Sequence, residues 1–573
     1  MQYMKLFITA ALMAACIHVG AQTLAPDYKG SNYGNPISAS VFCADPTALE
    51  YNGRLYVYGT NDHQQFLKNN KKGDNSYGDI KSLVIFSTED MVNWTFHGTI
   101  DVQKLCSTWT GNPWYKGFMN SWAPSVTWRH NEETGKDEFF LYFANTSHGV
   151  GVLTAESPVG PWKSPLKQSL INKDTPGALQ HSANFDPGVV IDDEGTGWLT
   201  FGGLDPDNGG TTLMPNNTRI IKLQPSMTAV DGTATLIPAP YHFEANELNM
   251  IGGKYVFTYC SNWNRDNAEW NAYTSEQGIT APVPGVGTMC YMVADNPSDP
   301  SSWVYKGVYG PHPGTSGNNH SHLQKFKGKY YHIYHSGALL EAMKKAGAIT
   351  DAGGFRSLCV NQATVNESMQ SISQVTLNIE GPAAVGTLNP YQLQQAETMA
   401  TCGGISYEDF TNITKNGLIS NLGNDASENM QVKMQEGSWF QLRRVEFGSE
   451  GASKLMLRAK GEGTVEVRIG MKGMDAAATF NVSSDEMSDY TVDVDASECN
   501  GTQAIYIVVA SGSEVYLDAW QAIGAQTDGI RQVETTPSAK ASDCYYNISG
   551  QHIDPSAHNS GIIIHNGSKY IKR

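Results

Sequence analysis

Three carboxylic acids occupy comparable places in the chain, each ahead of a glycine-containing turn that leads into an aromatic run. They are Asp45, Asp186 and Glu244, and the runs begin 10, 12 and 11 residues after them. Hydrolysis of a glycosidic bond needs one group that protonates the leaving oxygen and another that acts as base or nucleophile at the anomeric carbon. A third carboxylate beside the acid raises its pKa by repulsion between like charges. The three residues are therefore sufficient for glycosidic hydrolysis, with inversion or with retention of configuration.

Two further residues, Trp122 and His320, stand 17 and 10 residues ahead of their own aromatic runs. The five positions are 77, 64, 58 and 76 residues apart, which leaves each unit room for four short strands with tight turns. Radial repetition of four-stranded sheets is how a β-propeller avoids open sheet edges. The repeat therefore predicts an all-β fold whose first part is a five-bladed propeller.

The five residues are expected to meet because the innermost strands of a propeller converge on its axis. Asp45, Trp122, Asp186, Glu244 and His320 would then share one pocket. Each could instead be a local turn residue, since Asp45-Pro46 and Asp186-Pro187-Gly188 are turn sequences in their own right. That explanation suits a single position better than five at the same place in a repeat.

The composition fits this architecture and excludes some partners. The chain has 573 residues, with 39 Lys and Arg against 56 Asp and Glu, so its formal net charge is −17. Such a surface repels nucleic acids and anionic membranes, so we expect neither as a partner. Gly (57), Tyr (27), Phe (19) and Trp (12) suit a turn-rich β-protein whose aromatic faces stack on sugars.

Several short motifs follow one another in a specific order. They are Ala44-Asp45-Pro46, Ser121-Trp122-Ala123-Pro124, Ser157-Pro158-Val159-Gly160-Pro161-Trp162, Phe185-Asp186-Pro187-Gly188, Phe243-Glu244-Ala245 and Asn318-Asn319-His320-Ser321-His322. With these motifs, residues 36–365 resemble glycoside hydrolase family 43, a family of five-bladed propellers. The resemblance implies that Asp45 is the general base that activates water and Glu244 the general acid. It implies that Asp186 raises the pKa of the acid and orients it. The family inverts, which implies carboxyl groups about 6.5–9.5 Å apart with water between them.

Glu247 is the alternative to Glu244 as the acid. Glu244 is preferred because Phe243 flanks it and because Gly253 follows at the family's distance of nine residues. The resemblance also places Arg356 near the subsite of the cleaved sugar, where it holds a sugar hydroxyl or pairs with a catalytic carboxylate. A surface arginine on the closing blade is the alternative.

For Trp122 and His320 the sequence predicts a role less specifically. Trp122 is expected to line the pocket or to pack between blades. His320 matches a residue that in many family members faces a calcium ion in the central channel, although here His322 stands where a second histidine often follows directly. Calcium prefers oxygen ligands, so one histidine plus waters makes a weak site, and a core histidine is the alternative. No cofactor is expected to be required for the chemistry.

Residues 390–526 show alternating strand-like runs, such as Lys454–Arg458 and Ala504–Val509, with regular turns between them. This pattern predicts a β-sandwich (jelly-roll). Its motifs Gln395-Ala396-Glu397, Gly437-Ser438-Trp439-Phe440 and Leu517-Asp518-Ala519-Trp520 resemble carbohydrate-binding module family 6. The resemblance implies binding of xylan-type chains by aromatic stacking, and a structural calcium near the first acidic motif.

The sandwich departs from that family at two places. Gln395 replaces the usual first Glu, and Tyr516 stands where an Asn that contacts sugar is common. A purely structural sandwich is therefore the alternative. Tyr407 and Trp520 are candidate sugar platforms, with a place in the core as the alternative for each.

The two ends of the chain suggest export. Residues 1–21 carry Lys5, an apolar run too short to be a good membrane span, and small residues before Gln22, as a secretory signal does. A lipoprotein-like box ending at Cys16 is the less favoured cleavage site. Residues 371–389 and the start of 527–573 are expected to be linkers. The rest of 527–573 is a short tail that resembles sorting tails of the type 9 secretion route, with a stray hairpin as the alternative.

These features predict an exported, inverting glycoside hydrolase with its catalytic domain at residues 22–370, in the periplasm or outside the cell. The expected activity is that of an α-L-arabinofuranosidase on arabinoxylan, because the appended module resembles xylan binders. A β-xylosidase or an arabinan-cleaving enzyme would use the same three carboxylates. A carbohydrate-binding propeller without activity is the rival from another class, although all three acid positions are filled.

Overall fold

The computed structural model describes residues 23–112, 116–180, 183–204, 212–263, 265–314, 318–412 and 430–524, and the short strands 545–547, 552–553, 561–565 and 568–572. The expected export signal lies outside these residues. The chain divides into two compact units, Met1–Ala525 and Gln526–Arg573.

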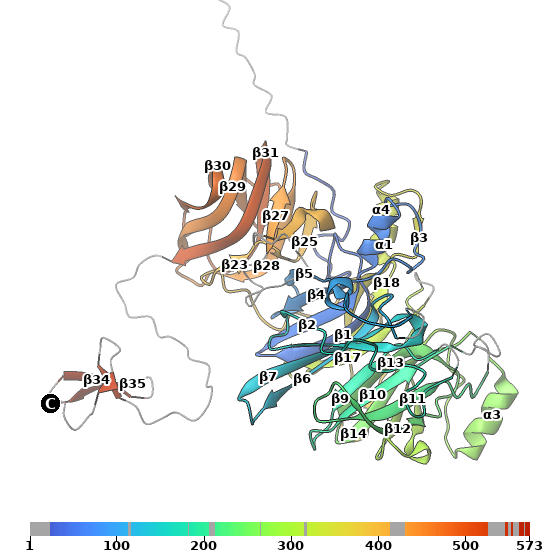
Figure 1. Cartoon of the computed structure of the whole chain (residues 1–573). Helices are drawn as coiled ribbons and strands as arrows, with labels where there is room; N and C mark the ends of the chain where they lie inside the picture. The colour runs from blue at the N-terminus through green and yellow to red at the C-terminus, as the bar shows by residue number, and fades with distance from the viewer. Residues whose placement is uncertain are drawn as a thin grey trace, which may run out of the picture. The chain divides into compact units, whose positions relative to one another are not determined.

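Five antiparallel sheets follow one another through the first unit and form a five-bladed propeller, as the repeat predicts (Figure 1). Blade 1 contains β1 (Ala44–Tyr51), β2 (Arg54–Thr60), β4 (Leu83–Thr88) and β5 (Trp94–Ile100). Blade 2 contains β6 (Trp122–Asn131), β7 (Lys136–Ala144) and β8 (Val150–Ala155). Blade 3 contains β9 (Gly188–Ile191), β10 (Gly197–Gly202), β11 (Thr218–Leu223) and β12 (Val230–Leu236). Blade 4 contains β13 (His242–Ile251), β14 (Lys254–Ser261), β15 (Met289–Ala294) and β16 (Val304–Gly310). Blade 5 contains β17 (Ser321–Phe326), β18 (Lys329–Ser336) and β20 (Ser357–Ala363).

Blades 2 and 5 differ from the expected four strands, because their sheets contain three. In blade 2 the segment that follows β8 is irregular and contacts it through single bridges, Val150 to Ile171 and Thr154 to Lys163. In blade 5 the segment that precedes β1 contacts the outer strand β20, where Ile37 N–H donates to Leu358 O at 2.9 Å. The amino-terminal segment therefore closes the ring of blades.

The inner strands of four blades share one backbone irregularity. Asp45, Ala123, Asp186 and Ala245 have positive φ values of 48°, 38°, 48° and 64°. The pairing register of β1, β6 and β13 shifts at the same places. A residue in this left-handed region interrupts the regular alternation of side chains along a strand. The irregularity therefore releases side chains from the sheet faces at the mouth of the propeller.

In the described part of the chain, four short α-helices and three 3₁₀ turns lie on the connections, namely α1 (Asp62–Lys68), α2 (Val102–Leu105), α3 (Asn267–Glu276), α4 (Ala338–Lys345), η1 (Thr146–His148), η2 (Pro300–Ser302) and η3 (Tyr407–Asp409). The Asn61 side chain caps α1 by accepting from Gln64 N–H. Phe66 of α1 packs against Phe42 and Phe355, with ring centroids 4.9 and 5.0 Å away. The pair of short strands β3 (Gly73–Asp74) and β19 (Ala352–Gly353) closes the same region, where α1, α4 and β3 lie together in Figure 1. These contacts fix α1 beside the segment that precedes Arg356.

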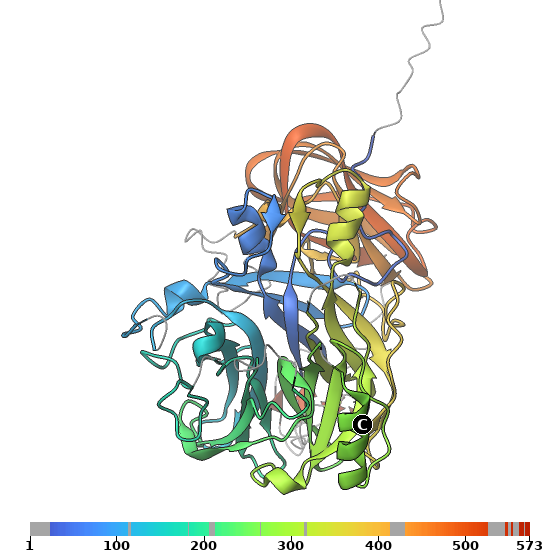
Figure 2. The same cartoon turned by 90° about the vertical axis from the view of Figure 1, so that its right-hand side faces the viewer.

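The carboxy-terminal part of the first unit is the expected sandwich of antiparallel strands. Three long strands dominate it, β29 (Ala452–Ile469), β30 (Ala476–Asp493) and β31 (Thr502–Gly524). The shorter strands are β23 (Gln394–Gln395), β25 (Thr401–Gly403), β26 (Phe410–Asn412), β27 (Met430–Met434) and β28 (Trp439–Glu446). A small hairpin of β21 (Val365–Asn366) and β22 (Ser371–Ile372) precedes them. In both views the orange sandwich lies against the blue strands of blade 1 (Figure 1, Figure 2).

Neither candidate sugar platform of the sandwich is an exposed ring. Trp520 is 3% exposed and belongs to the hydrophobic core. Tyr407 stacks on His63 of the propeller, with ring centroids 4.4 Å apart. Both rings are therefore packing residues.

The second unit contains a four-stranded antiparallel sheet, in the order β33 (His552–Ile553), β32 (Tyr545–Asn547), β34 (Gly561–His565) and β35 (Ser568–Lys572). Sequence analysis predicted strands at the places of β32 and β34. Within the described part of the chain, no helix is long and apolar enough to cross a membrane.

Candidate active site

The five residues that the repeat singles out line one cavity of about 150 Å³. Asp45, Trp122 and Glu244 belong to the inner strands β1, β6 and β13, and Asp186 and His320 stand just before β9 and β17. Asp45 and Asp186 occupy the positive-φ position of their blades, whereas Trp122 and Glu244 stand one residue earlier. The cavity also receives Tyr77, Ala123, Phe185, Asn318 and Arg356.

Asp45 is held as an anion. Its Oδ1 lies 2.7 Å from Arg356 Nη1 and 3.3 Å from His335 Nδ1. Burial alone would raise the pKa of Asp45, but the guanidinium and the histidine hold it well below its usual range. His320 Nδ1 lies 3.8 Å from the same oxygen, and burial lowers the pKa of His320 to about 4, so its ring is neutral near pH 7. An ionised carboxylate in this position has the charge state of a general base.

Glu244 and Asp186 hold their protons more tightly than free carboxyls do. Burial and then repulsion from Asp45 raise the pKa of Glu244 to about 7. Burial and then repulsion from Glu244 and Asp45 raise the pKa of Asp186 well above its ordinary value. Asp186 Oδ2 accepts a hydrogen bond from Ala245 N–H at 2.9 Å, so it also holds the backbone next to Glu244. The pair can therefore supply a proton on the side of the pocket that carries Glu244.

Arg356 is a buried partner of carboxylates rather than a surface residue. Its side chain is 3% exposed, and it donates to Asp45 and, through two nitrogens, to Asp62. Of the two roles expected from the sequence, the structure has the pairing with a carboxylate. Asp62 was not predicted, because a single acid at the start of a short helix has no sequence signal of its own.

Aromatic side chains form part of the pocket wall. Trp122 lines it, as expected, and its Nε1–H donates to Tyr77 O at 3.1 Å. Tyr77 places its ring centroid 5.0 Å from the Arg356 guanidinium. Phe185 and Asn318 stand inside sequence motifs already noted, whereas Tyr77 lies in a loop with no repeat signal and was missed.

Glu247, the alternative acid, lies outside the lining of the cavity. It is fully buried, its Oε2 accepts from Ser125 Oγ at 3.0 Å, and its Oε1 lies 3.2 Å from His322 Nδ1. Its position two residues beyond the positive-φ residue Ala245 directs it into the propeller core. Of the two glutamates, Glu244 is the one that lines the cavity.

Metal ligands are sparse in the described structure, which contains no group of three or more His, Cys, Asp or Glu side chains suited to a metal. His320 offers only its Nε2, a buried atom without a hydrogen-bond partner, and a lone nitrogen does not fit the oxygen cage that calcium prefers. The described part of the sandwich offers carboxylate oxygens instead of a nitrogen. Both carboxylate oxygens of Glu397 are buried without a hydrogen-bond partner, and burial and then the charge of Asp518 raise the pKa of Glu397 well above its ordinary value.

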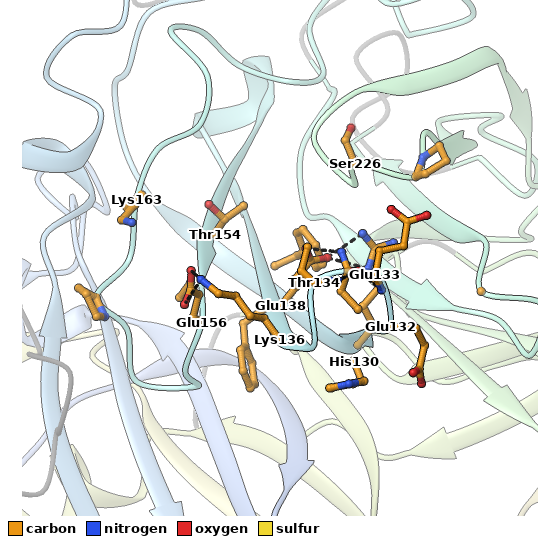
Figure 3. A pocket seen from close by; sticks show the side chains of 18 residues that line it. His130, Glu132, Glu133, Thr134, Lys136, Glu138, Thr154, Glu156, Lys163 and Ser226 are labelled. Carbon is orange, nitrogen blue, oxygen red and sulfur yellow. Dashed lines mark hydrogen bonds and ion pairs between the residues drawn. The ribbon is translucent and has the colours of Figure 1, made fainter.

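A larger cavity of about 1090 Å³ lies between parts of blades 2 and 3 (Figure 3). Four of its charged side chains form two ion pairs, Arg129 with Glu138 at 2.8 Å and Lys136 with Glu156 at 2.9 Å. None of the five residues of the repeat lines it. The five residues of the repeat therefore make the smaller pocket the candidate site.

Comparison with known proteins gives matches across most of the chain. The model for glycosyl hydrolases family 43 matches residues 33–351, and that for carbohydrate binding module family 6 matches residues 395–523. The chain is similar to an arabinoxylan arabinofuranohydrolase of Paenibacillus polymyxa, with 35% identity over 500 residues that cover 85% of this chain and 74% of that protein. An arabinoxylan arabinofuranohydrolase of Bacillus subtilis (strain 168) is 33% identical over 504 residues, 85% of this chain and 92% of that protein. The solved structure of a family 43 arabinoxylan arabinofuranohydrolase from Bacillus subtilis, in complex with cellotetraose, has a TM-score of 0.74 and 32% identity. It covers 88% of this chain and 99% of that chain.

Proposed function

This chain belongs to family 43 of the glycosyl hydrolases, and from that membership we propose that it removes α-L-arabinofuranosyl side chains from arabinoxylan with inversion of configuration. The chain is a glycoside hydrolase by family. One observation carries the choice of substrate: the likeness to arabinoxylan arabinofuranohydrolases runs through both the propeller and the sandwich. A β-xylosidase or an arabinan-cleaving activity is the second candidate, because these enzymes use the same three carboxylates.

The proposed chemistry is a single displacement. Asp45, kept ionised by Arg356, accepts a proton from a water molecule that attacks the anomeric carbon. Glu244, whose pKa is raised to about 7, donates its proton to the oxygen of the leaving xylan chain. Asp186 accepts a hydrogen bond from Ala245 N–H and so holds the backbone next to Glu244, which orients the acid. Trp122 and Tyr77 offer apolar faces to the sugar.

Two further proposals concern the rest of the chain. The first is that the sandwich holds a structural calcium ion through Glu397 and Asp518. This ion supplies the missing partner for the buried Glu397 carboxylate. The chain is exported, a proposal that the signal-like residues 1–21 support. Neither proposal changes the chemistry at Asp45 and Glu244.

The test is incubation of the protein with arabinoxylan while proton NMR follows the released sugar. We expect early release of β-configured arabinose from the α-linked side chains, because a single displacement inverts the anomeric carbon. The Glu244→Ala variant serves as the control and should release arabinose at less than about 1% of the wild-type rate. Release of xylose from xylo-oligosaccharides without release of arabinose would replace the proposed substrate by that of a xylosidase.

A further inference from the structure

Helix α1 carries a buried carboxylate directly behind the catalytic base. Asp62 is the first residue of α1 and is 0% exposed. All three hydrogen bonds that its carboxylate accepts within the described residues come from Arg356: from the backbone N–H at 3.0 Å, from Nε at 2.9 Å and from Nη2 at 2.8 Å. The remaining nitrogen, Nη1, donates to Asp45 at 2.7 Å. One guanidinium therefore joins two carboxylates, of which only Asp45 lines the pocket.

We propose that Asp62 is a positioning residue for the hydrolytic reaction, and that the sandwich holds Asp62 in place through Tyr407. The proposal rests on the proposed function, since it concerns the orientation of the Asp45 carboxylate toward the attacking water. A guanidinium is a planar fork, so two hydrogen bonds to one carboxylate fix its plane. Asp62 supplies those two bonds, which leaves Arg356 only Nη1 to offer to Asp45.

Only one of the two carboxylate oxygens of Asp45 is hydrogen-bonded to Arg356. Arg356 Nη1 donates to Oδ1 at 2.7 Å, and Nδ1 of His335 and of His320 lie 3.3 and 3.8 Å from the same oxygen. Oδ2 is therefore the oxygen that can accept a proton from the attacking water. If Asp62 lost its charge, Arg356 could turn a second nitrogen toward Asp45 and form a two-pronged pair, which would cover Oδ2. Asp62 thus leaves Oδ2 of Asp45 open to water, because it accepts the hydrogen bonds from Nε and Nη2 of Arg356.

The residues on both sides of Asp62 are held by the sandwich. Asn61 Nδ2 donates to the Tyr407 hydroxyl at 3.1 Å, and the His63 ring stacks on the Tyr407 ring at 4.4 Å and 14°. Next to Tyr407, Glu408 pairs with Lys71 at 2.8 Å. Tyr407 therefore braces the start of α1 from outside the propeller. The appended module is in this way connected to Asp45 through Asp62 and Arg356.

The first experiment compares kcat and KM of the full chain and of Asp62→Asn on a pentose-releasing substrate. We expect kcat to fall about 100-fold with a much smaller change in KM, because a misplaced base slows chemistry more than binding. Asp90→Asn is the matched control. Asp90 is a buried carboxylate of blade 1 that accepts four hydrogen bonds from its own turn and does not line the pocket. It should lower the melting temperature and leave kcat unchanged.

A double-mutant cycle separates positioning from a loss of structure. In an Arg356→Lys background the fork is absent, so adding Asp62→Asn should lower kcat by less than about threefold. A merely structural role would give the same loss in both backgrounds. Equal losses, or a folded Asp62→Asn variant within about twofold of the wild-type kcat, would overturn the assignment.

Tyr407 tests the link to the sandwich. Tyr407→Phe keeps the stacking on His63 and should retain most of the kcat, whereas Tyr407→Ala should lower kcat roughly tenfold at a temperature where the protein is folded. Wild-type kcat in Tyr407→Ala would remove the sandwich from the proposal. If the wild type is inactive on arabinoxylan but cleaves another pentoside, the proposed substrate fails. The ratio of variant to wild-type kcat on that other pentoside then still decides the role of Asp62.

Discussion

The protonation state of Glu244 should set the upper limit of the working pH. Burial and the charge of Asp45 raise its pKa to about 7, whereas Arg356 keeps the pKa of Asp45 far lower. A general acid works while it holds its proton. We therefore expect kcat/KM for arabinoxylan to be flat on the acid side of neutrality and to fall as the pH rises through about 7. A pH series of arabinose release measures this directly.

The leaving group provides the control for that assignment. A 4-nitrophenyl arabinofuranoside has a good leaving group, so it needs little protonation and its alkaline fall should be weaker. By the same argument, Glu244→Gln should lose about 100-fold or more on arabinoxylan and far less on the aryl substrate. An equal loss on both substrates would assign the acid to another residue.

The raised pKa of Asp186 should lower the free energy of unfolding at alkaline pH. Burial and then the charges of Glu244 and Asp45 raise its pKa, so the folded state binds the proton more tightly than the unfolded chain does. The stability that such a carboxyl contributes is full below its unfolded pKa and is lost as the pH rises through the folded value. Asn removes this loss, and it tolerates the φ of 48° at this position.

We therefore expect Asp186→Asn to be inactive yet to melt higher than the wild type, on the order of 2 °C at about pH 8. The two proteins should melt alike at or below about pH 3, under the unfolded aspartate pKa of about 3.9, where the wild-type carboxyl is protonated in both states. Melting curves at the two pH values provide the measurement. A lower melting temperature of the variant at pH 8 would show that the ionised carboxylate stabilises the fold.

At the scale of elements, the inner strands explain how far the sequence could lead. Asp45 and Glu244 are recognisable because each stands 10 or 11 residues ahead of an aromatic strand, with a turn before that strand, and a similar local order repeats in every blade. The one-residue offset between them is not visible in the sequence, because it depends on which residue takes the positive φ. The three-stranded sheets of blades 2 and 5 were missed for a similar reason, since irregular segments complete them.

Contacts between distant elements explain what the sequence could not reveal. Asp62 and Arg356 are 294 residues apart, and neither the start of α1 nor the end of β19 carries a motif that would pair them. Tyr77 reaches the pocket from a loop that β3 and β19 hold in place through a parallel pair of only two residues each. Local pattern thus predicts the strands and their ends, whereas the partners of a catalytic group depend on how loops from different blades meet.

The strands of the sandwich should depend on calcium. Glu397 stands between β23 and the short strand β24 (Thr398–Met399), and its buried carboxylate lacks a hydrogen-bond partner in the described structure. Without a cation this buried carboxyl either stays an unpaired charge or takes up a proton, and both cost free energy, so removal of a cation should destabilise this region. We expect a chelator to lower the melting temperature of the wild type, and calcium to restore it.

Substitution at the same site should abolish that response. Glu397→Gln removes the charge, so its melting temperature should no longer depend on calcium. Asp489→Asn, on the exposed face of β30 where Asp489 pairs with Arg458, should still respond. A chelator effect that persists in Glu397→Gln would place the ion elsewhere.

On the scale of the molecule, the propeller and the sandwich of the first unit share one core. Strand β24, which leads into the sandwich, pairs with β5 and becomes the fifth strand of the blade 1 sheet. Phe96 of blade 1 packs edge-on against Phe410 of the sandwich, with ring centroids 5.0 Å apart. The buried cluster that contains both rings continues without a break from blade 1 into the sandwich. Domains joined by a large hydrophobic interface are not expected to move or unfold independently.

We therefore expect the first unit to unfold in a single cooperative step. Phe410→Ala should remove about 3–5 kcal/mol from the shared core and lower the temperature at which arabinose release is lost, although Phe410 lies outside the catalytic pocket. Calorimetry of the wild type and the variant, with activity followed over the same temperature range, measures this. Leu199→Ala, in the core between blades 2 and 3, is the matched control and should shift the whole transition in the same way. If the variants instead split the transition, so that Phe410→Ala melts the sandwich while activity persists, the shared core does not couple the two parts and the sandwich folds as an independent domain.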